Sequence, residues 1–215
     1  MNKIENNRFK ITEESLIKLN EISENMEGTT FHKHTHILYD IRTEFGDKPI
    51  TYLEIGSYAG ASISLISSHK YPTNCFTLDL GTPISSDIVK RNVSKFKNEQ
   101  SSFDYMQGNS QDINIINHVK NEIKEIDILF IDGDHSKNGV FEDFNNYSSL
   151  VKNGGYIAFD DYLDHQYSPE VYGAVNDIVL NLNPDEYDII GALTYDLLKN
   201  FTNLEKNNIF LLKKK

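Results

Sequence analysis

The chain alternates short apolar runs with longer amphipathic stretches. Five runs are rich in Ile, Leu, Phe or Tyr and have the length of strands: 50–55, 75–80, 103–106, 126–132 and 156–160. The stretches between them carry apolar residues at helical spacing. This alternation is typical of a parallel sheet that is covered by helices on both faces. We therefore predict an α/β fold with a doubly wound, mostly parallel sheet.

The clearest helical pattern lies between the fourth and fifth runs. Val140, Phe144 and Tyr147 follow one another at spacings of three and four. The pattern continues to Val151, and Asn153-Gly154-Gly155 has the composition of a C-terminal stop. We therefore expect one helix to run through Val151 and to join the fourth strand to the fifth.

Two further helical patterns precede the first run, at about 14–24 and 34–44. Together they are too short for a separate domain. We expect an N-terminal helical cap over residues 1–46, followed by the sheet-bearing domain over residues 47–215.

The segment after the fifth run holds the remaining expected elements. A polar, aromatic loop is predicted at 162–172, and a helix is predicted near 174–182. Two final apolar runs, 187–193 and 208–212, predict a pair of strands. We expect this pair to close the edge of the sheet with an antiparallel C-terminal strand.

Composition narrows the class of protein. A length of 215 residues, 39% of them apolar, is enough to bury a sizeable core in one domain. The formal net charge of −11, without a long basic block, makes duplex nucleic acid a poor candidate partner. Cys75 is the single cysteine, the N-terminus has no apolar signal core, and no apolar run approaches the roughly 18 residues of a membrane span. We expect a soluble, cytoplasmic protein that does not bind membranes.

The first predicted strand leads into a turn that contains two glycines. Gly56 and Gly60 would let the backbone turn tightly and approach a ligand beside the helix that follows. Glu54 precedes them, and the G-x-x-x-G spacing differs from the G-x-G-x-x-G of dinucleotide-binding turns. A pyrophosphate site is therefore disfavoured, and a plain strand-to-helix turn stays an alternative.

Polar residues also follow the second and third predicted strands. Asp79 lies 23 residues after Gly56, close to the offset of about 20 at which a ribose-binding acid follows a glycine turn. An ordinary loop aspartate is the alternative. Asn109 and Ser110 would suit the edge of a purine, but this segment would equally suit a helix cap.

Acidic residues follow the fourth and fifth predicted strands. Asp132, Asp160 and Asp161 would meet at one rim, because these two strands are neighbours in a doubly wound sheet. Crowded carboxylates repel one another unless a cation lies between them. Oxygen ligands select a hard cation, with Mg²⁺ first and Ca²⁺ or Mn²⁺ as alternatives. Capping of the following helices is the alternative role for these acids.

His135 lies three residues after Asp132, where its imidazole could reach a group bound at the same rim. Its ordinary pKa of about 6.5 suits a general base, although a lone histidine is often structural. His32, His34 and His36 alternate at the start of a predicted helix, so they do not share one face, and no cysteine supports zinc. We do not predict a zinc site.

Together these segments resemble the class I, Rossmann-like S-adenosylmethionine-dependent methyltransferases over roughly residues 50–180. The segments that carry the resemblance are 54–60, Asp79, 132–135 and 154–162. The last two are similar to metal-dependent O-methyltransferases that act on sugar hydroxyls of antibiotics, such as macrocin O-methyltransferase and its aminocoumarin relatives. Cephalosporin hydroxylase-like proteins share the pattern.

The resemblance implies roles for individual residues. The methionine part of S-adenosylmethionine would contact the turn that holds Glu54, Gly56, Ser57 and Gly60. Asp79 would bind the ribose hydroxyls, and Asn109 and Ser110 would lie near the adenine. Residues 28–36 loosely resemble the segment that closes over the cofactor, which makes His34 and His36 weak candidates.

The resemblance also implies a metal-assisted reaction. Asp132, Asp160 and Asp161 would hold Mg²⁺, and His135 would accept the proton of the attacking hydroxyl. Catechol O-methyltransferase and its plant relatives carry a lysine at the position of His135, so Asp132 and Lys137 remain alternative bases. The acceptor would be a small molecule with a hydroxyl, with the loop at 162–172 as its aromatic wall.

Other roles for the fold stay open. A hydroxylase-like or catalytically silent cofactor-binding protein would share these motifs. A nicotinamide-dependent oxidoreductase is disfavoured by the missing G-x-G-x-x-G. Related enzymes often assemble through N-terminal helices, which leaves a homo-oligomer open.

Overall fold

A seven-stranded sheet forms the centre of the fold in the computed structural model, which describes residues 13–28, 35–193 and 209–215. The strand order is β3-β2-β1-β4-β5-β7-β6. The strands are β1 (Ile50–Ile55), β2 (Thr73–Asp79), β3 (Ser102–Gln107), β4 (Ile126–Ile131), β5 (Val151–Phe159), β6 (Tyr187–Leu193) and β7 (Ile209–Lys214). The first five pair in parallel, and β7 is antiparallel to both β5 and β6. The predicted sheet and its antiparallel C-terminal strand are confirmed.

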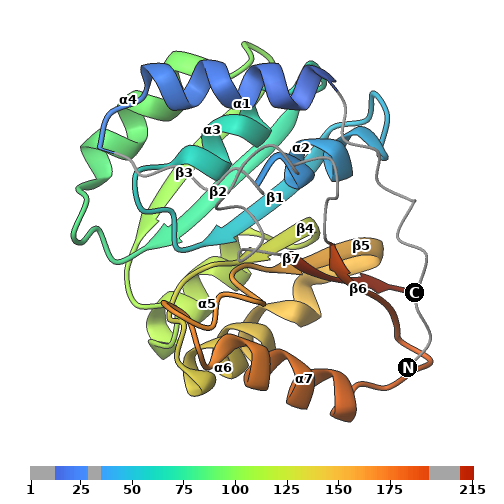
Figure 1. The fold of residues 1–215 in the computed structure, drawn as a ribbon. Coiled ribbons are helices and arrows are strands. Elements are labelled where there is room, and N and C mark those ends of the chain that lie inside the picture. Colours follow the sequence, from blue (N-terminus) through green and yellow to red (C-terminus); the bar gives the residue numbers. More distant parts are fainter. Residues whose placement is uncertain (1–12, 29–34, 194–208) are drawn as a thin grey trace.

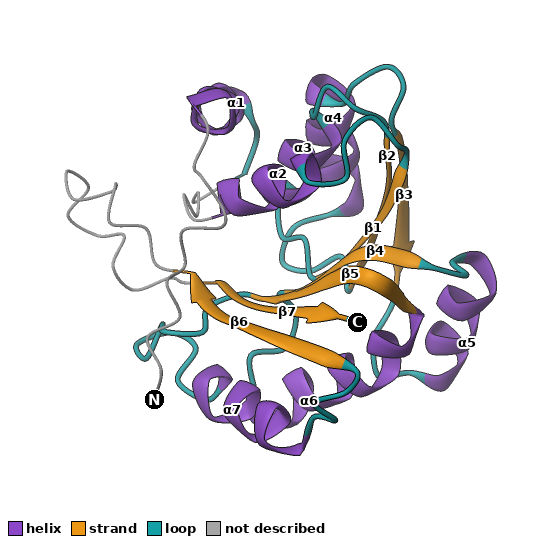
Figure 2. Ribbon diagram, turned by 90° about the vertical axis from the view of Figure 1, so that its right-hand side faces the viewer, coloured by secondary structure: helices purple, strands orange, loops and turns teal. Residues whose placement is uncertain are grey.

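Helices cover both faces of this sheet (Figure 1). They are α1 (Glu13–Asn25), α2 (His36–Thr43), α3 (Ala61–Ser67), α4 (Ser86–Phe96), α5 (Ile113–Glu122), α6 (Lys137–Tyr147) and α7 (Val171–Asn181). Figure 2 shows α2, α3 and α4 over one face, with α1 outside them, and α5, α6 and α7 over the other. In the described ranges, no helix combines the length and hydropathy that crossing a membrane requires.

Two hydrophobic cores lie on opposite faces of the sheet. In β4, Leu129 and Ile131 belong to the core beneath α5, α6 and α7, whereas Ile128 and Phe130 belong to the core beneath α2, α3 and α4. Successive side chains of a strand point to opposite faces, so a strand covered on both faces must be apolar at nearly every position. This is why the central strands could be predicted as continuous apolar runs.

The N-terminal helices pack on the rest of the fold through two different surfaces. Residues Ile37, Leu38 and Ile41 of α2 enter the core that α3, α4 and the sheet share. In contrast, Leu19 and Ile22 of α1 belong to a small separate cluster outside that core. The helices predicted at 14–24 and 34–44 are therefore present in the described residues, while the domain boundary near residue 46 stays a prediction.

The connection from α6 to β5 differs from the prediction of one helix through Val151. The helix ends at Tyr147, a single 3₁₀ turn follows, and Val151 already belongs to β5. The register of β4 and β5 shifts between the pairs Ile126–Val151 and Ile128–Tyr156, so residues 152–155 of β5 lie opposite the single residue Asp127 of β4. The Asn153-Gly154-Gly155 segment is therefore part of a strand and does not end the helix.

Candidate active site

A cavity of about 810 Å³ lies at the carboxyl ends of the five parallel strands β1 to β5. Its lining includes residues from the loops that follow these strands, together with Thr35 from the segment before α2. The predicted residues in the lining are Gly56, Ser57, Asp79, Asn109, Ser110, Asp132, His135, Asp160 and Asp161. Cavities of roughly 300–1,000 Å³ are typical of sites for small molecules and cofactors. The loops after neighbouring parallel strands thus meet at one site, whereas Glu54 and Gly60, also predicted to contact the cofactor, are not part of its lining.

The turn after β1 approaches the loop after β4 so closely that only glycine fits at position 56. Gly56 has a φ of +81°, and a Cβ there would lie 2.1 Å from the carbonyl oxygen of Asp132. Gly60, at the N-terminus of α3, also has a positive φ, +82°. The first glycine therefore meets a steric requirement as well as a conformational one.

Asp79 ties two of the turns around the cavity together. One carboxylate oxygen accepts hydrogen bonds from the backbone N–H of Ser57, at 2.7 Å, and from its hydroxyl, at 3.2 Å. The other accepts from the backbone N–H of Gly81, at 2.6 Å, and from the hydroxyl of Tyr105, at 3.1 Å. The carboxylate therefore fixes the walls of the cavity that it lines.

Glu54 lies behind the glycine turn and does not line the cavity. Its side chain is fully buried, and its carboxyl accepts a hydrogen bond of 2.5 Å from the hydroxyl of Tyr52. Burial raises the pKa of Glu54 to about 8, although the Tyr52 hydroxyl acts in the opposite direction. The structure thus gives Glu54 a place beneath the turn, whereas the sequence-based expectation put it against the cofactor.

The sequence of the loop after β3 suited either a purine-binding segment or a helix cap, and the structure shows that different residues of the loop line the cavity and cap the helix. Asn109 and Ser110 line the cavity, and the carbonyl of Ser110 accepts a hydrogen bond from the hydroxyl of Tyr147 on α6. Asp112 caps α5 by accepting a hydrogen bond of 2.7 Å from the backbone N–H of Asn114. The first part of the loop therefore faces the cavity, and the second part starts the helix.

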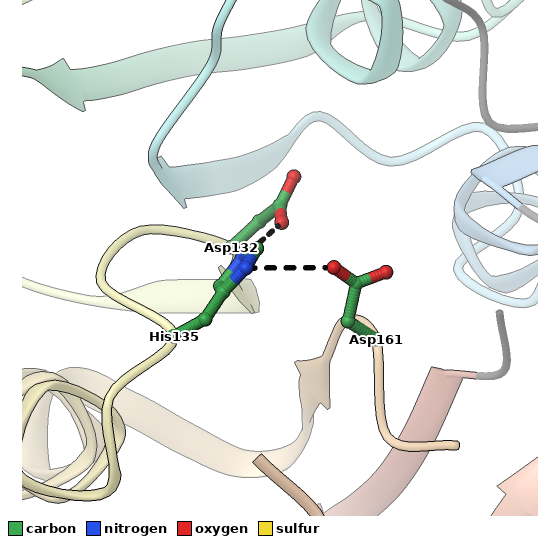
Figure 3. A group of neighbouring side chains, drawn as sticks. All are labelled: Asp132, His135 and Asp161. Atoms are coloured by element: carbon green, nitrogen blue, oxygen red, sulfur yellow. Dashed lines mark hydrogen bonds and ion pairs between the residues drawn. The ribbon is translucent and has the colours of Figure 1, made fainter. Parts of the chain in front are cut away.

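Asp132, His135 and Asp161 form a cluster at the cavity (Figure 3). One ligand atom from each of the three lies within 4.8 Å of the others. The Nε2 of His135 is 3.2 Å from Asp132 Oδ1, and its Nδ1 is 3.5 Å from Asp161 Oδ2. Asp160 lines the same cavity beside them. The acids predicted to converge from the ends of β4 and β5 thus border one space.

The electrostatics of this cluster favour a positive charge. Burial raises the pKa of Asp132, and the neighbouring Asp160 carboxylate raises it further. Burial disfavours the protonated form of His135, but its hydrogen bond to Asp132 and the nearby carboxylates outweigh this effect and raise the pKa of His135 to about 9. Three acids and one histidine share the space, so a bound cation would relieve the repulsion between the carboxylates.

Capping of α6 is carried out by a residue other than the predicted acids. Ser136 is the N-cap of this helix, and its hydroxyl accepts a hydrogen bond of 3.0 Å from the backbone N–H of Gly139. Lys137, the alternative base, pairs through its ammonium with Asp177 of α7 at 2.5 Å and does not line the cavity. Of the residues considered as bases, Asp132 and His135 therefore face the site.

A comparison with protein families agrees with this arrangement. Residues 53–162 match the family model that is described as a methyltransferase domain. The chain belongs to this methyltransferase domain family. An uncharacterized protein of Acanthamoeba polyphaga mimivirus is 37% identical to this methyltransferase over 206 residues, which cover 91% of this chain and 93% of that protein.

Solved structures of methyltransferases share the fold at low sequence identity. The O-methyltransferase of Bacillus cereus in complex with SAH has a TM-score of 0.63 at 16% identity, covering 94% of this chain and 91% of its own. An rRNA methylase of Streptococcus thermophilus has a TM-score of 0.60 at 13% identity. The match covers 88% of this chain and 99% of the methylase. MycE of the mycinamycin biosynthetic pathway, in complex with Mg and SAH, has a TM-score of 0.61 at 16% identity. The match covers 92% of this chain and 54% of MycE. These likenesses confirm the class I, Rossmann-like methyltransferase fold.

Some residues of the methyltransferase site could not be predicted from the sequence. Ser168 is buried, donates a hydrogen bond of 2.7 Å to Asp161 Oδ2, and lies 2.8 Å from the Nδ1 of His135. It belongs to an irregular polar loop, and no spacing rule singles it out. Thr35 lines the cavity from the N-terminal side, in the segment predicted to close over the cofactor. His36 is buried at the start of α2, whereas His32 and His34 lie outside the described residues.

The loop predicted as the acceptor wall is only partly available to a ligand. Tyr162 is buried and packs against Tyr172 of α7, with 5.1 Å between the ring centroids. His165 is exposed and contacts the edge of the same Tyr172 ring. Tyr167 is 78% exposed. Tyr167 is therefore free to contact solvent, but no residue of 162–172 lines the cavity, so the role of this loop as the acceptor wall stays a prediction.

Proposed function

We propose that this methyltransferase is an S-adenosylmethionine-dependent O-methyltransferase that acts, with a divalent cation, on a hydroxyl of a small molecule. Sugars and other diol-bearing natural products are the acceptor class, and Mg²⁺ is the first choice of cation. The observation that carries the proposal is the cluster of Asp132, His135 and Asp161 in the cavity that the Gly56 turn also lines.

The cavity fits S-adenosylmethionine in size and in chemistry. Its volume of about 810 Å³ is sufficient for a nucleoside with an amino acid attached. The glycine turn offers a close approach to backbone, and the Asp79 carboxylate would accept from ribose hydroxyls in exchange for its contacts with the Ser57 and Tyr105 hydroxyls. Asn109 and Ser110 offer polar groups for a purine edge. SAH in the structures of the Bacillus cereus enzyme and of MycE supports the same cofactor here.

The acidic side of the cavity fits a hard cation. Asp132, Asp160 and Asp161 would hold it through oxygen atoms, the ligands that Mg²⁺ prefers. Burial raises the pKa of Asp132 and the neighbouring Asp160 carboxylate raises it further, so a cation among these acids would relieve their repulsion. Mg in the MycE structure supports the choice of metal.

The chemistry divides between the bound groups and the chain's own residues. S-adenosylmethionine supplies a methyl group activated by its sulfonium, and the cation lowers the pKa of the acceptor hydroxyl. His135 would accept the hydroxyl proton at Nε2, which lies 3.2 Å from Asp132. Against the effect of burial, the carboxylates raise the pKa of His135 to about 9 in the chain alone, and a cation bound among them would lower this pKa toward the range of a general base. The Gly56 turn and Asp79 would hold the cofactor, and in-line transfer would require the acceptor oxygen on the far side of the methyl carbon from the sulfur.

The acceptor would bind beside the tyrosine that lines the cavity. Tyr58 lines the cavity and is 49% exposed, whereas Tyr167, on the loop that follows Asp161, is exposed but is not part of the lining. Aromatic faces pack on the apolar faces of sugar and phenol rings. A ring that bears adjacent hydroxyls could therefore stack on a tyrosine while its oxygens face the acids.

The decisive experiment measures transfer of a labelled methyl group from S-adenosylmethionine to a panel of sugars, catechols and polyketide diols. We expect activity to disappear in excess EDTA and to return with Mg²⁺. His135→Ala should retain SAH affinity but transfer methyl about 10² to 10⁴ times more slowly, because it lacks the general base. His118→Ala, an exposed histidine on α5, is the matched control and should keep the parent rate.

The possible results of these experiments distinguish the proposed function from its alternatives. Full activity in EDTA would overturn the metal dependence. SAH binding without transfer to any acceptor in the panel would favour a hydroxylase-like or catalytically silent protein of the same fold. A His135→Ala rate close to that of the parent would move the base to Asp132.

A further inference from the structure

Ser168 connects the two catalytic candidates that come from different strands. His135 follows β4, Asp161 follows β5, and the Ser168 hydroxyl lies 2.8 Å from His135 Nδ1 and 2.7 Å from Asp161 Oδ2. The direct separation of His135 Nδ1 and Asp161 Oδ2 is longer, at 3.5 Å. The shorter contacts run through the serine, so the hydroxyl is the effective link between histidine and acid.

The direction of these hydrogen bonds follows from counting protons. An ionised carboxylate can only accept, so the single hydroxyl proton of Ser168 is donated to Asp161. The lone pairs of the hydroxyl then face His135, and a favourable contact requires a proton on Nδ1. The other nitrogen, Nε2, lies 3.2 Å from Asp132 Oδ1, so by the same count it donates to an ionised Asp132 when the ring is charged. The two nitrogens of the ring therefore have different partners: Nδ1 contacts the buried Ser168, and Nε2 contacts Asp132, which lines the cavity.

The turn that carries Ser168 is itself held in place. Asp164 accepts hydrogen bonds of 3.0 Å at Oδ1 from the backbone N–H groups of Gln166 and Tyr167. Its carbonyl accepts a third from the backbone N–H of Ser168, also at 3.0 Å. Ser168 is only 2% exposed. A buried hydroxyl on a braced turn has little freedom to leave its partners.

We propose that Ser168 is the positioning residue of the site: its buried hydroxyl, held by Asp161, fixes the His135 ring through Nδ1 and leaves Nε2 directed toward Asp132, where the acceptor would bind. This role rests on the proposed function, in which His135 Nε2 is the general base. Groups that hold the far nitrogen of a catalytic or metal-bound histidine act in this way, by fixing the tautomer and the ring orientation.

The first test observes the imidazole directly and needs no turnover. The full chain, labelled with ¹⁵N at histidine, is examined by long-range ¹H–¹⁵N NMR with Mg²⁺ and SAH, at a pH where the His135 ring is neutral. The His135 signals are assigned by their loss in His135→Ala. We expect the parent to carry its proton on Nδ1, and Ser168→Ala to shift the ring toward the Nε2–H form. A parent ring protonated on Nε2 overturns the proposal, whatever the variants do.

The second test measures kinetics. Ser168→Ala should lower kcat by about 10- to 100-fold, the range found for residues that hold a catalytic group. KM for S-adenosylmethionine should stay close to the parent value, since the cofactor does not contact this serine in the proposed arrangement. Ser168→Thr keeps the hydroxyl and should restore both the Nδ1–H signal and most of the rate.

A matched control separates positioning from loss of a buried hydrogen bond. Ser101 is also buried, and its hydroxyl accepts a hydrogen bond of 3.0 Å from the backbone N–H of Thr73, away from the cavity. Ser101→Ala should keep the parent kcat and imidazole spectrum, and equal losses in both alanine variants would overturn the proposal. Absence of methyl transfer in the parent would count against the proposed function alone, because the NMR result would still decide the role of Ser168.

Discussion

Two glycines with nearly the same backbone conformation differ in their surroundings. Gly56 has a φ of +81° and Gly154 has +84°. A Cβ at Gly56 would lie 2.1 Å from the Asp132 carbonyl oxygen, whereas a Cβ at Gly154 would meet nothing within 4 Å. The pair therefore allows the steric requirement at the site to be measured separately from the cost of a positive φ.

We expect Gly56→Ala to abolish or strongly weaken SAH binding, because the turn must move away from the loop after β4. Gly154→Ala should bind SAH like the parent and lose only about 1–2 kcal/mol of unfolding free energy, the cost of the left-handed backbone. Calorimetric titration with SAH and urea denaturation measure the two effects. Equal SAH affinity in the two variants would contradict the role of the turn.

The buried Glu54 predicts a pH dependence of stability. Its pKa of about 8 in the folded chain lies above the ordinary value of 4.5, so the folded state binds the extra proton between these values. The stabilisation from this proton is complete below about pH 4.5 and is lost as the pH rises through about 8. Within that window the slope approaches roughly 1.4 kcal/mol per pH unit.

Glu54→Gln removes the titration and keeps the shape of the side chain. Urea denaturation at a series of pH values should show a flatter profile for this variant between pH 5 and 8 than for the parent. Parallel profiles would mean that Glu54 is ionised in the folded chain at neutral pH.

At the level of residues, the site could be predicted from the sequence because most of its polar side chains lie directly at the ends of predicted strands. Asp79, Asp132 and Asp161 each come within two residues of a buried strand end, and the topology of a parallel sheet brings such positions together. Ser168 and the burial of Glu54 could not be predicted in this way. They depend on how a loop folds and on which face of β1 a side chain occupies.

At the level of elements, two serines at helix N-termini allow the contribution of a capping hydrogen bond to stability to be measured. Ser136 caps α6 through its hydroxyl, whereas Ser85, at the N-cap of α4, makes no side-chain capping hydrogen bond. We expect Ser136→Ala to lower the free energy of unfolding by about 1 kcal/mol, and Ser85→Ala to change it much less. Urea denaturation measures both. An equal loss would mean that the hydrogen bond to Gly139 does not stabilise α6.

The elements were predictable where hydrophobic periodicity is strong. The stripe of Val140, Phe144 and Tyr147 placed α6 correctly, but its end was predicted four residues too late, at Val151. Apolar character alone does not distinguish the last turn of a helix from the first residue of a strand. Pairing of Val151 with Ile126 decides the matter, and this contact between distant residues is absent from any local pattern.

At the level of the whole molecule, the parallel sheet followed from alternating strands and helices, and its antiparallel edge from the two final apolar runs. The insertion of β7 between β5 and β6 could not be read in the same way, because the sequence does not state which neighbour a strand will choose. The pairing places Leu211 and Leu212 on opposite faces, one in each of the two main cores. Which face of β7 each leucine occupies depends on the pairing of the strands, so it could not be predicted from the apolar run alone.

The same assembly predicts how a ligand affects global stability. The cavity is formed by the loops after five strands, so a molecule that binds there stabilises the whole folded chain against the unfolded one. At a free concentration 100 times its Kd, SAH should add about 2.7 kcal/mol, which corresponds to a rise in Tm of roughly 5–11 °C for a domain of this size. NAD at the same concentration should leave Tm unchanged, because the turn after β1 lacks the dinucleotide-binding spacing. Thermal unfolding followed by circular dichroism measures both shifts, with Gly56→Ala as the control in which the SAH shift should disappear. A shift with NAD that equals or exceeds the shift with SAH would contradict the assignment of the cavity to S-adenosylmethionine.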